Sequence, residues 1–209
     1  MRVVGHEEMN IGFLASHNGS NMQAIIDACK TGALRASPAV VISNNSGSGA
    51  LARAKQEGIP WYYLSSKTHP NPQELDQAIR DAMLEHAVDL IVLAGYMKKL
   101  GPRTLSLFAG RILNIHPALL PKFGGKGMYG MLVHEAVIAS GETESGVSIH
   151  IVDAEYDTGP VIAQACVPVE PMDTPETLAV RVLRREHTFF VETLQKIVTG
   201  EIMLPTPHK

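Results

Sequence analysis

The sequence predicts an α/β fold: a Rossmann-like, mostly parallel twisted sheet with helices on both faces and an antiparallel C-terminal extension. In the first half, short apolar runs alternate with helical patterns, as in parallel sheets joined by right-handed crossovers. One run, Val88 to Leu93, is apolar throughout, which is typical of a strand covered on both faces. In the second half, residues 147–152 and 161–169 alternate in polarity around a tight turn, which indicates antiparallel pairing.

The strands of the first half are short apolar runs that end at turn residues. They are expected at Asn10 to Ala15, Ala39 to Ile42, Trp61 to Leu64 and Val88 to Leu93. The helices between them carry apolar residues at every third or fourth position. They are expected at Asn21 to Lys30, Gly49 to Glu57 and Pro72 to His86. Gly58 ends the second helix, because glycine accepts the left-handed backbone that follows many helices.

The second half changes rhythm after a further short strand. The expected elements are a strand at Arg111 to Ile115, a Gly/Pro-rich stretch from Pro117 to Gly130, a helix at Val133 to Ala139, strands at Val147 to Val152 and Val161 to Val169, and a helix at Pro175 to Val198. No internal repeat or long linker divides the chain, so a single domain over residues 1–209 is expected.

The composition argues against several classes of protein. The 209 residues are 45% hydrophobic with a net charge of -3, which suits a globular domain and indicates no nucleic-acid or membrane surface. The first eight residues are too polar for a signal peptide, and no apolar run reaches membrane-spanning length. Cys29 and Cys166 make no disulfide framework and are expected as small buried hydrophobes. A reducing, cytoplasmic compartment is therefore expected.

A candidate phosphate loop runs from Ser16 to Asn21, between the first strand and the first helix. Its small residues let the backbone approach a ligand, and free N–H groups at the helix start favour an anion. Neither the Walker pattern nor G-x-G-x-x-G is present, so a phosphate monoester fits better than a nucleoside triphosphate or a dinucleotide. The alternative is an ordinary turn with Ser20 as the helix N-cap.

A candidate catalytic group stands at the end of the strand near residue 115. Alternation places Asn114 and His116 on one side, where a carboxamide and an imidazole can stabilise an oxyanion and move a proton. Asp157, in a tight loop, is expected to face His116, hold it cationic and order a water. The alternatives are a polar strand end with a satisfied histidine, and an aspartate that only shapes its turn. No cluster has metal-ligand spacing, and Ser148 lacks the G-x-S-x-G context of a nucleophilic hydrolase.

Four stretches give the chain a resemblance to a known family. They are Asn18-Gly19-Ser20-Asn21, Val92 to Leu100, Asn114 to Gly130 and Asp153 to Ile162, with a shorter match at Arg185 to His187. The chain resembles the phosphoribosylglycinamide formyltransferases, folate-dependent enzymes of purine synthesis. The resemblance implies that a formyl group passes from 10-formyltetrahydrofolate, a co-substrate, to the amine of glycinamide ribonucleotide. A monomer or homodimer with small-molecule substrates is expected, without metal, nucleic acid or membrane.

The resemblance also assigns roles to individual residues. It implies catalysis by Asn114, His116 and Asp157. It implies binding of the ribonucleotide by Gly19, Ser20, Asn21 and Glu186. It implies binding of the folate by Met97, Lys98, Lys99, Leu100, Val152, Asp153, Ala154, Glu155 and Tyr156. Within the single domain we expect a short N-terminal extension (1–8), a phosphate-binding half (9–110) and a catalytic and folate-binding half (111–209).

The chain departs from the family pattern at His17, where glycine is usual, and at Leu132, where histidine is frequent. Two related folate enzymes, formyltetrahydrofolate deformylase and methionyl-tRNA formyltransferase, share the catalytic trio but carry an additional domain, for which this chain is expected to leave no room. An alternative from another class is a binding protein for phosphorylated ligands without catalysis. The joint presence of Asn114, His116 and Asp157 argues against that alternative.

Overall fold

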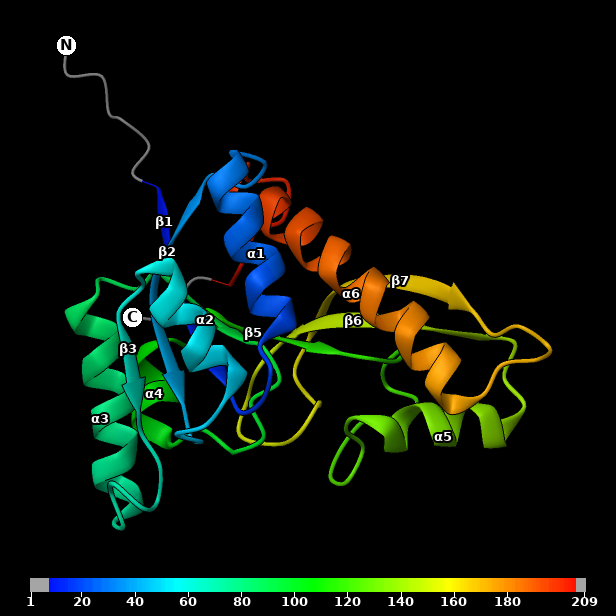
Figure 1. Cartoon of the computed structure of the whole chain (residues 1–209), viewed down its shortest axis with the longest axis horizontal. Helices are drawn as coiled ribbons and strands as arrows, with labels where there is room; N and C mark the ends of the chain where they lie inside the picture. Colours follow the sequence, from blue (N-terminus) through cyan, green and yellow to red (C-terminus); the bar gives the residue numbers. More distant parts are fainter. Residues whose placement is uncertain (1–7, 206–209) are drawn as a thin grey trace.

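The computed structural model describes residues 8–205. Its centre is a seven-stranded sheet with the order β3-β2-β1-β4-β5-β6-β7 (Figure 1). The strands are β1 (Met9–Ala15), β2 (Ala36–Ser43), β3 (Trp61–Tyr63), β4 (Leu90–Leu93), β5 (Ile112–His116), β6 (Glu144–Ile151) and β7 (Val161–Pro168). Strands β1 to β5 pair in parallel, whereas β6 pairs antiparallel with both β5 and β7. The predicted parallel sheet with an antiparallel extension is therefore confirmed.

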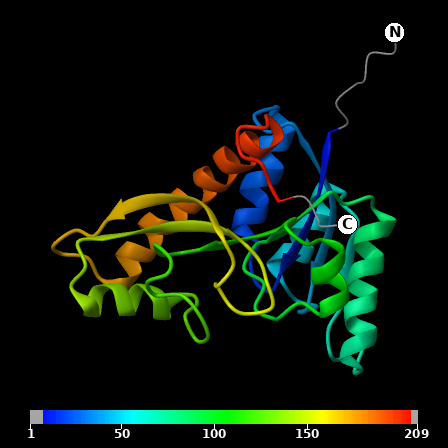
Figure 2. The same cartoon turned by 180° about the vertical axis from the view of Figure 1, so that it is seen from behind.

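Helices cover both faces of the sheet, as predicted. They are α1 (Ser20–Thr31), α2 (Gly49–Glu57), α3 (Pro72–Glu85), α4 (Pro102–Leu107), α5 (Met131–Ser140) and α6 (Pro175–Val198). One hydrophobic cluster joins the sheet to α1, α2, α5 and α6, and a second joins it to α3 and α4. Figures 1 and 2 show an elongated molecule with α3 and α4 at one end and α5, β6 and β7 toward the other. Within residues 8–205, no helix is long and apolar enough to span a membrane.

Helix α4 is an element that the sequence pattern did not predict. It has six residues, and its start depends on Asp76 of α3, which accepts hydrogen bonds from the backbone N–H groups of Arg103 at 2.8 Å and Thr104 at 3.0 Å. The Thr104 hydroxyl also donates to Asp76 at 2.7 Å. A side chain at Gly101 would collide with Asp76, so glycine permits the contact. Because the capping residue is distant in sequence, the helix leaves little local signal.

The cysteines and the N-terminal extension were also predicted from the sequence. The prediction that both cysteines are buried is wrong for Cys166, which is exposed on β7, the edge strand of the sheet, while Cys29 is half-buried. A periodic pattern marks a strand but does not reveal that the strand lies at an edge. The expected N-terminal extension over residues 1–8 lies outside the described residues, except for Glu8.

The loops after β1 and β4 meet where the strand order reverses, the place at which α/β sheets bind ligands. Ser16, just after β1, links the two loops: its N–H donates to the Gly95 carbonyl at 3.0 Å, and its hydroxyl oxygen accepts from the Met97 N–H at 2.9 Å. The Ser16 hydroxyl in turn donates to Asn44 after β2 at 2.6 Å. Three loops are thus tied together at the carboxyl edge of the sheet.

Candidate active site

Asn114 and His116 lie at the carboxyl end of β5, opposite His150 and Ser148 of β6. The Asn114 amide nitrogen lies 3.0 Å from Nε2 of His150, and Nδ1 of His150 lies 3.0 Å from the Ile151 carbonyl oxygen. A carbonyl oxygen only accepts, so Nδ1 of His150 carries a proton, and Nε2 accepts from Asn114 when the ring is neutral. His150 therefore fixes the direction of the Asn114 side chain. The sequence assigned it no role, because its place opposite Asn114 follows only from the strand register.

Asp157 reaches this group from the connection between β6 and β7. Its Oδ2 lies 3.6 Å from Nδ1 of His116, and its Oδ1 lies 3.4 Å from Nε2 of His150. The Gly125 N–H donates to Oδ2 at 2.9 Å. The structure thus brings together Asn114, His116 and Asp157, with His150 touching both Asn114 and Asp157.

Asp153, rather than Asp157, shapes the turn in this connection. Its carboxylate accepts the Thr158 hydroxyl at 2.9 and 3.0 Å and the Glu155 N–H at 3.0 Å. Asp157 has a φ of 57°, a left-handed conformation that aspartate adopts more readily than most residues. Asp153 therefore makes the turn contacts that the sequence left open for Asp157. The Asp157 carboxylate instead faces His116 and His150.

The protonation of His116 follows from its neighbours. Its Nε2 lies 2.7 Å from the carbonyl oxygen of Phe123, so Nε2 must be the donor and carry a proton. The ring nitrogen that faces Asp157 is Nδ1. A proton gained or lost by His116 is therefore gained or lost at Nδ1, beside the carboxylate.

The ionisation of the pair is set by burial and by close partners. Burial lowers the pKa of His116, and this outweighs the opposing effects of Asp157 and the Phe123 carbonyl. Burial would raise the pKa of Asp157, but a hydrogen bond from Nε2 of His150 when that ring is protonated, the charge of His116 and the Gly125 N–H hold it below its usual value. The expectation that Asp157 keeps His116 cationic is therefore corrected. In the free protein a neutral imidazole beside an ionised carboxylate is favoured.

Ser148 supports the loop that follows β5. Its hydroxyl donates to the Ala118 carbonyl at 2.6 Å and accepts from the Leu120 N–H at 2.9 Å. Gln164 of β7 donates both to the Ser148 oxygen at 2.8 Å and to the Leu120 carbonyl at 3.0 Å. These bonds fix the loop on the sheet beside His116, and they give Ser148 a structural task.

Gly19, Ser20 and Asn21 form the start of α1 at the carboxyl end of β1. Gly19 precedes the helix with a φ of 69°, and none of the described side chains caps it. Ser20 is the first helical residue, so the alternative with Ser20 as N-cap is wrong. A Cβ on Gly19 would lie 2.9 Å from Cβ of Ala50, so glycine serves both the backbone conformation and the approach of α2. The uncapped N–H groups make this helix end suitable for an anion.

Glu186 of α6 meets Asn21 of α1 beside this loop. The Asn21 amide nitrogen donates to Oε2 of Glu186 at 3.0 Å, and the Glu186 side chain is buried. Burial raises the pKa of Glu186 to about 7, against the smaller opposing effect of Asn21. Within the described residues, the Asn21 side-chain oxygen is buried without a hydrogen-bond partner.

The raised pKa of Glu186 predicts how stability changes with pH. The folded state holds a proton on Glu186 that the unfolded state has lost, so the free energy of unfolding falls as pH rises from about 4.5 to about 7. The total loss is about 3 kcal/mol. Glu186→Gln keeps the shape and abolishes the loss, so the variant should exceed the parent in stability at pH 8 but not at pH 4.5. Urea unfolding of both proteins measures this, and parallel pH profiles would contradict it.

The two segments expected to bind folate, residues 97–100 and 152–156, approach each other. Lys99 Nζ lies 2.9 Å from Oε2 of Glu155 and 5.2 Å from the centre of the Tyr156 ring. Leu100 is buried in the cluster beneath α3, and Val152 packs against that cluster. Lys98, Asp153 and Ala154 are exposed, and Met97 is half-buried.

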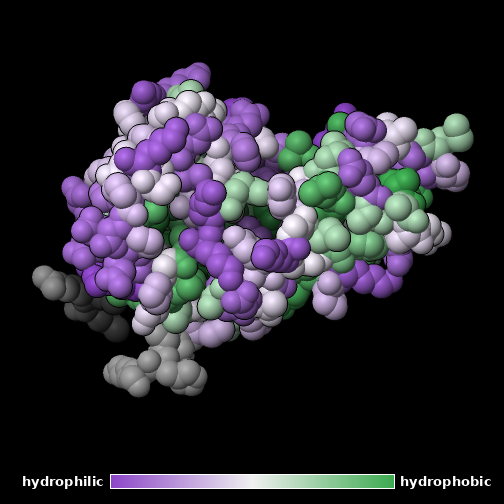
Figure 3. All heavy atoms as spheres, turned by 90° about the horizontal axis from the view of Figure 1, so that it is seen from below, coloured by the Kyte–Doolittle hydropathy of each residue, from purple (hydrophilic) through white to green (hydrophobic). Residues whose placement is uncertain are grey.

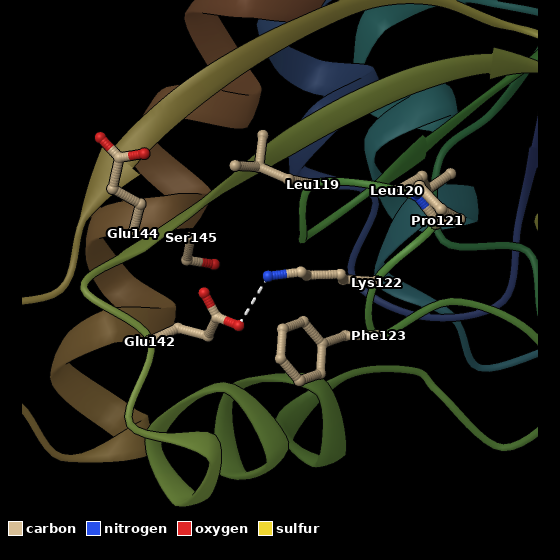
Figure 4. A pocket seen from close by; sticks show the side chains of 8 residues that line it. All are labelled: Leu119, Leu120, Pro121, Lys122, Phe123, Glu142, Glu144 and Ser145. Carbon is tan, nitrogen blue, oxygen red and sulfur yellow. Dashed lines mark hydrogen bonds and ion pairs between the residues drawn. The ribbon is translucent and has the colours of Figure 1, made fainter.

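A cavity of about 280 Å³ lies behind the loop that follows β5 and contains none of the expected site residues. It is lined by Leu119, Leu120, Pro121, Lys122, Phe123, Glu142, Glu144 and Ser145 (Figure 4). An ion pair of 2.7 Å joins Lys122 to Glu142. Phe123 lines this cavity, while its carbonyl oxygen binds His116. The cavity is therefore next to the loop that follows β5 but separate from the candidate site.

The two departures from the family pattern have different surroundings. His17 is exposed, and its carbonyl oxygen accepts the Ala50 N–H at 3.1 Å. Leu132 is exposed on α5, whereas His134 of the same helix is buried. Figure 3 shows hydrophobic residues gathered toward one end of the molecule. Neither departure changes the group around Asp157.

The chain is similar to known proteins over most of its length. The sequence model of the formyl transferase family matches residues 9–194. A phosphoribosylglycinamide formyltransferase of Haemophilus influenzae is 42% identical, over 93% of this chain and 89% of the relative. The chloroplastic phosphoribosylglycinamide formyltransferase of Vigna unguiculata is also 42% identical, over 92% of this chain, which spans only 62% of that longer relative.

A solved structure matches as well. The glycinamide ribonucleotide transformylase 1 of Symbiobacterium toebii superposes with a TM-score of 0.88 at 35% identity, over 97% of this chain and 93% of the other. This chain therefore belongs to the formyl transferase family.

Proposed function

We propose that this chain transfers the formyl group of 10-formyltetrahydrofolate to the amine of glycinamide ribonucleotide, a step of purine biosynthesis. The observation that carries the proposal is that Asn114, His116 and Asp157 meet at the same edge of the sheet as the uncapped start of α1. The three side chains suit acyl transfer, and the uncapped start of α1 suits a phosphate. The names of the relatives point to the same reaction.

Asn114 and His116 stabilise the charge that develops on the formyl oxygen. The substrate amine forms a bond to the formyl carbon, and the bond from that carbon to the folate nitrogen breaks. Asn114 offers an amide N–H whose direction His150 fixes. His116 acts from Nδ1 when that nitrogen is protonated, because its Nε2 is engaged with Phe123.

Asp157 assists proton transfer. The attacking amine must lose a proton, and the departing folate nitrogen must gain one. The Asp157 carboxylate, ionised between His116 and His150, supports the imidazolium as charge develops and orders a water that carries the proton. The proposed steps call on no metal ion and no covalent enzyme intermediate. Holding two substrates together supplies much of the rate.

The substrate phosphate binds at Gly19, Ser20 and Asn21, and Glu186 contacts the ribonucleotide. The folate binds along residues 97–100 and 152–156, where Lys99, Glu155 and Tyr156 gather. In the sheet, β4 lies between β1, which leads to the phosphate loop, and β5, which carries Asn114, and the folate segments follow β4 and β6. The chain acts as a single domain in the cytoplasm, as a monomer or homodimer, and its two free cysteines suit a reducing compartment.

Ser20→Asp is expected to weaken binding of the ribonucleotide. A negative charge beside the phosphate costs about 1 to 4 kcal/mol, which raises KM for the ribonucleotide roughly 5- to 1,000-fold. Ser20→Asn, of the same size without the charge, is the matched control and should show a much smaller effect. Steady-state kinetics with each substrate varied in turn measure the change. Equal KM values for the two variants would place the phosphate elsewhere.

A spectroscopic assay of formyl transfer tests the function itself. Purified protein is mixed with 10-formyltetrahydrofolate, with and without glycinamide ribonucleotide, and the deformylated folate is followed by absorbance. Consumption only in the presence of the ribonucleotide is the expected result. Consumption without it would indicate a deformylase, and ribonucleotide binding without any consumption would indicate a binding protein.

A further inference from the structure

Helix α2 contacts the phosphate loop at two successive carbonyl groups. The Ala50 N–H donates to the His17 carbonyl at 3.1 Å, and Nε of Arg53 donates to the Asn18 carbonyl at 2.9 Å. Nη2 of Arg53 also lies 3.4 Å from Oδ1 of Asn18. Nη1 of Arg53 lies 3.4 Å from Oε1 of Gln23, a residue of α1. Arg53 is thus held between the loop and the first helix.

These contacts decide which way the N–H groups of the loop point. A trans peptide is planar, so its N–H points away from its own C=O. With the carbonyls of His17 and Asn18 turned to α2, the N–H groups of Asn18 and Gly19 point to the opposite side. Within residues 8–205, neither of these N–H groups donates a hydrogen bond. They extend the row of free donors at the start of α1.

The close approach of α2 depends on small residues. A Cβ on Gly49 would lie 2.7 Å from Oδ1 of Asn18 and 3.1 Å from its Cα. Since Asn18 lies in direct contact with both Gly49 and Arg53, a change at either position moves the same peptide.

We propose that Arg53 is a positioning residue for the substrate phosphate: its forked hydrogen bonds to Asn18 aim the N–H groups of Asn18 and Gly19 at the anion. The inference rests on the proposed function for the identity of the substrate. Arg53 acts through the direction of the loop peptides rather than through its charge. A lysine keeps the charge but cannot reproduce the planar fork.

Kinetics of Arg53 variants test this role. Arg53→Ala is expected to raise KM for the ribonucleotide about tenfold, the effect of a lost hydrogen bond to a charged group, with kcat and KM for the folate within about twofold. Arg53→Lys should lose as much as Arg53→Ala. Lys55→Ala, which removes a charge from the exposed side of the same helix, should leave all three constants unchanged. Wild-type KM in Arg53→Lys, or a fall in kcat alone, would overturn the proposal.

Gly49→Ala provides an independent variant with Arg53 intact. Its Cβ displaces Asn18, so KM for the ribonucleotide should rise while KM for the folate stays constant. Unchanged constants would contradict the inferred role of the Asn18 peptide. Thermal unfolding of each variant shows that the comparison is made on folded protein.

Calorimetric binding of inorganic phosphate separates this inference from the proposed function. If the parent protein does not formylate the ribonucleotide, the proposed function fails, but phosphate binding still tests Arg53. About tenfold weaker phosphate binding in both Arg53→Ala and Arg53→Lys supports the role. Equal binding in parent and variants, or none in the parent, rejects it.

Discussion

Asp157→Asn is expected to lower kcat about a thousandfold, within the range of a lost acid–base group, with a much smaller change in either KM. Asparagine is nearly isosteric and tolerates the left-handed backbone at this position, where φ is 57°. Its side-chain oxygen can still accept the Gly125 N–H. What the variant loses is the negative charge beside Nδ1 of His116, so the imidazolium is no longer supported as charge develops.

The measurement is steady-state kinetics combined with thermal unfolding. Asp81→Asn, a change of an exposed acid on α3, is the matched control and should leave kcat unchanged. A folded Asp157→Asn protein with near-normal kcat would remove Asp157 from the mechanism.

His116→Ala is expected to lower kcat by about 10²- to 10⁴-fold. The variant lacks the imidazole that donates a hydrogen bond to the oxyanion and that gains or loses a proton at Nδ1. It also removes the hydrogen bond to the Phe123 carbonyl, so the loop after β5 loses one of its anchors. The alanine variant alone would therefore mix a chemical effect with a structural one.

His116→Gln separates the two effects. Its amide can still donate to the Phe123 carbonyl but cannot become cationic. We expect kcat of this variant to remain at least a hundredfold below the parent, while its unfolding temperature stays closer to the parent than that of His116→Ala. Full activity of the glutamine variant would show that a neutral donor suffices and would contradict proton exchange at Nδ1. His69→Gln serves as the control.

Local patterns in the sequence predicted much of the fold. Gly58 ends α2 and, with its φ of 69°, takes the left-handed conformation for which glycine is suited. The alternation along β5 placed Asn114 and His116 on one side, and the register with β6 agrees. Both predictions depend on interactions within a few residues of the chain.

Features that depend on distant residues were not predictable in the same way. His150 contacts Asn114 only because β5 and β6 pair in one particular antiparallel register. The low pKa of His116 depends on burial beneath a loop whose path no periodicity encodes. The exposure of Cys166 depends on β7 being an edge strand.

The hydrogen bond between Asn21 and Glu186 joins residues 165 positions apart, at the first and last helices of the described chain. Asn114, His116 and Asp157 all precede α6. During synthesis, these three side chains therefore leave the ribosome before Glu186, so the proposed ribonucleotide contact is the last part of the site to form. A chain that stopped before Glu186 would also lack Phe190 and Leu194 of the core, so it would lose stability together with this contact. Conversely, a ligand that bridges α1 and α6 would stabilise the finished protein by about 2.7 kcal/mol at a hundred times its Kd.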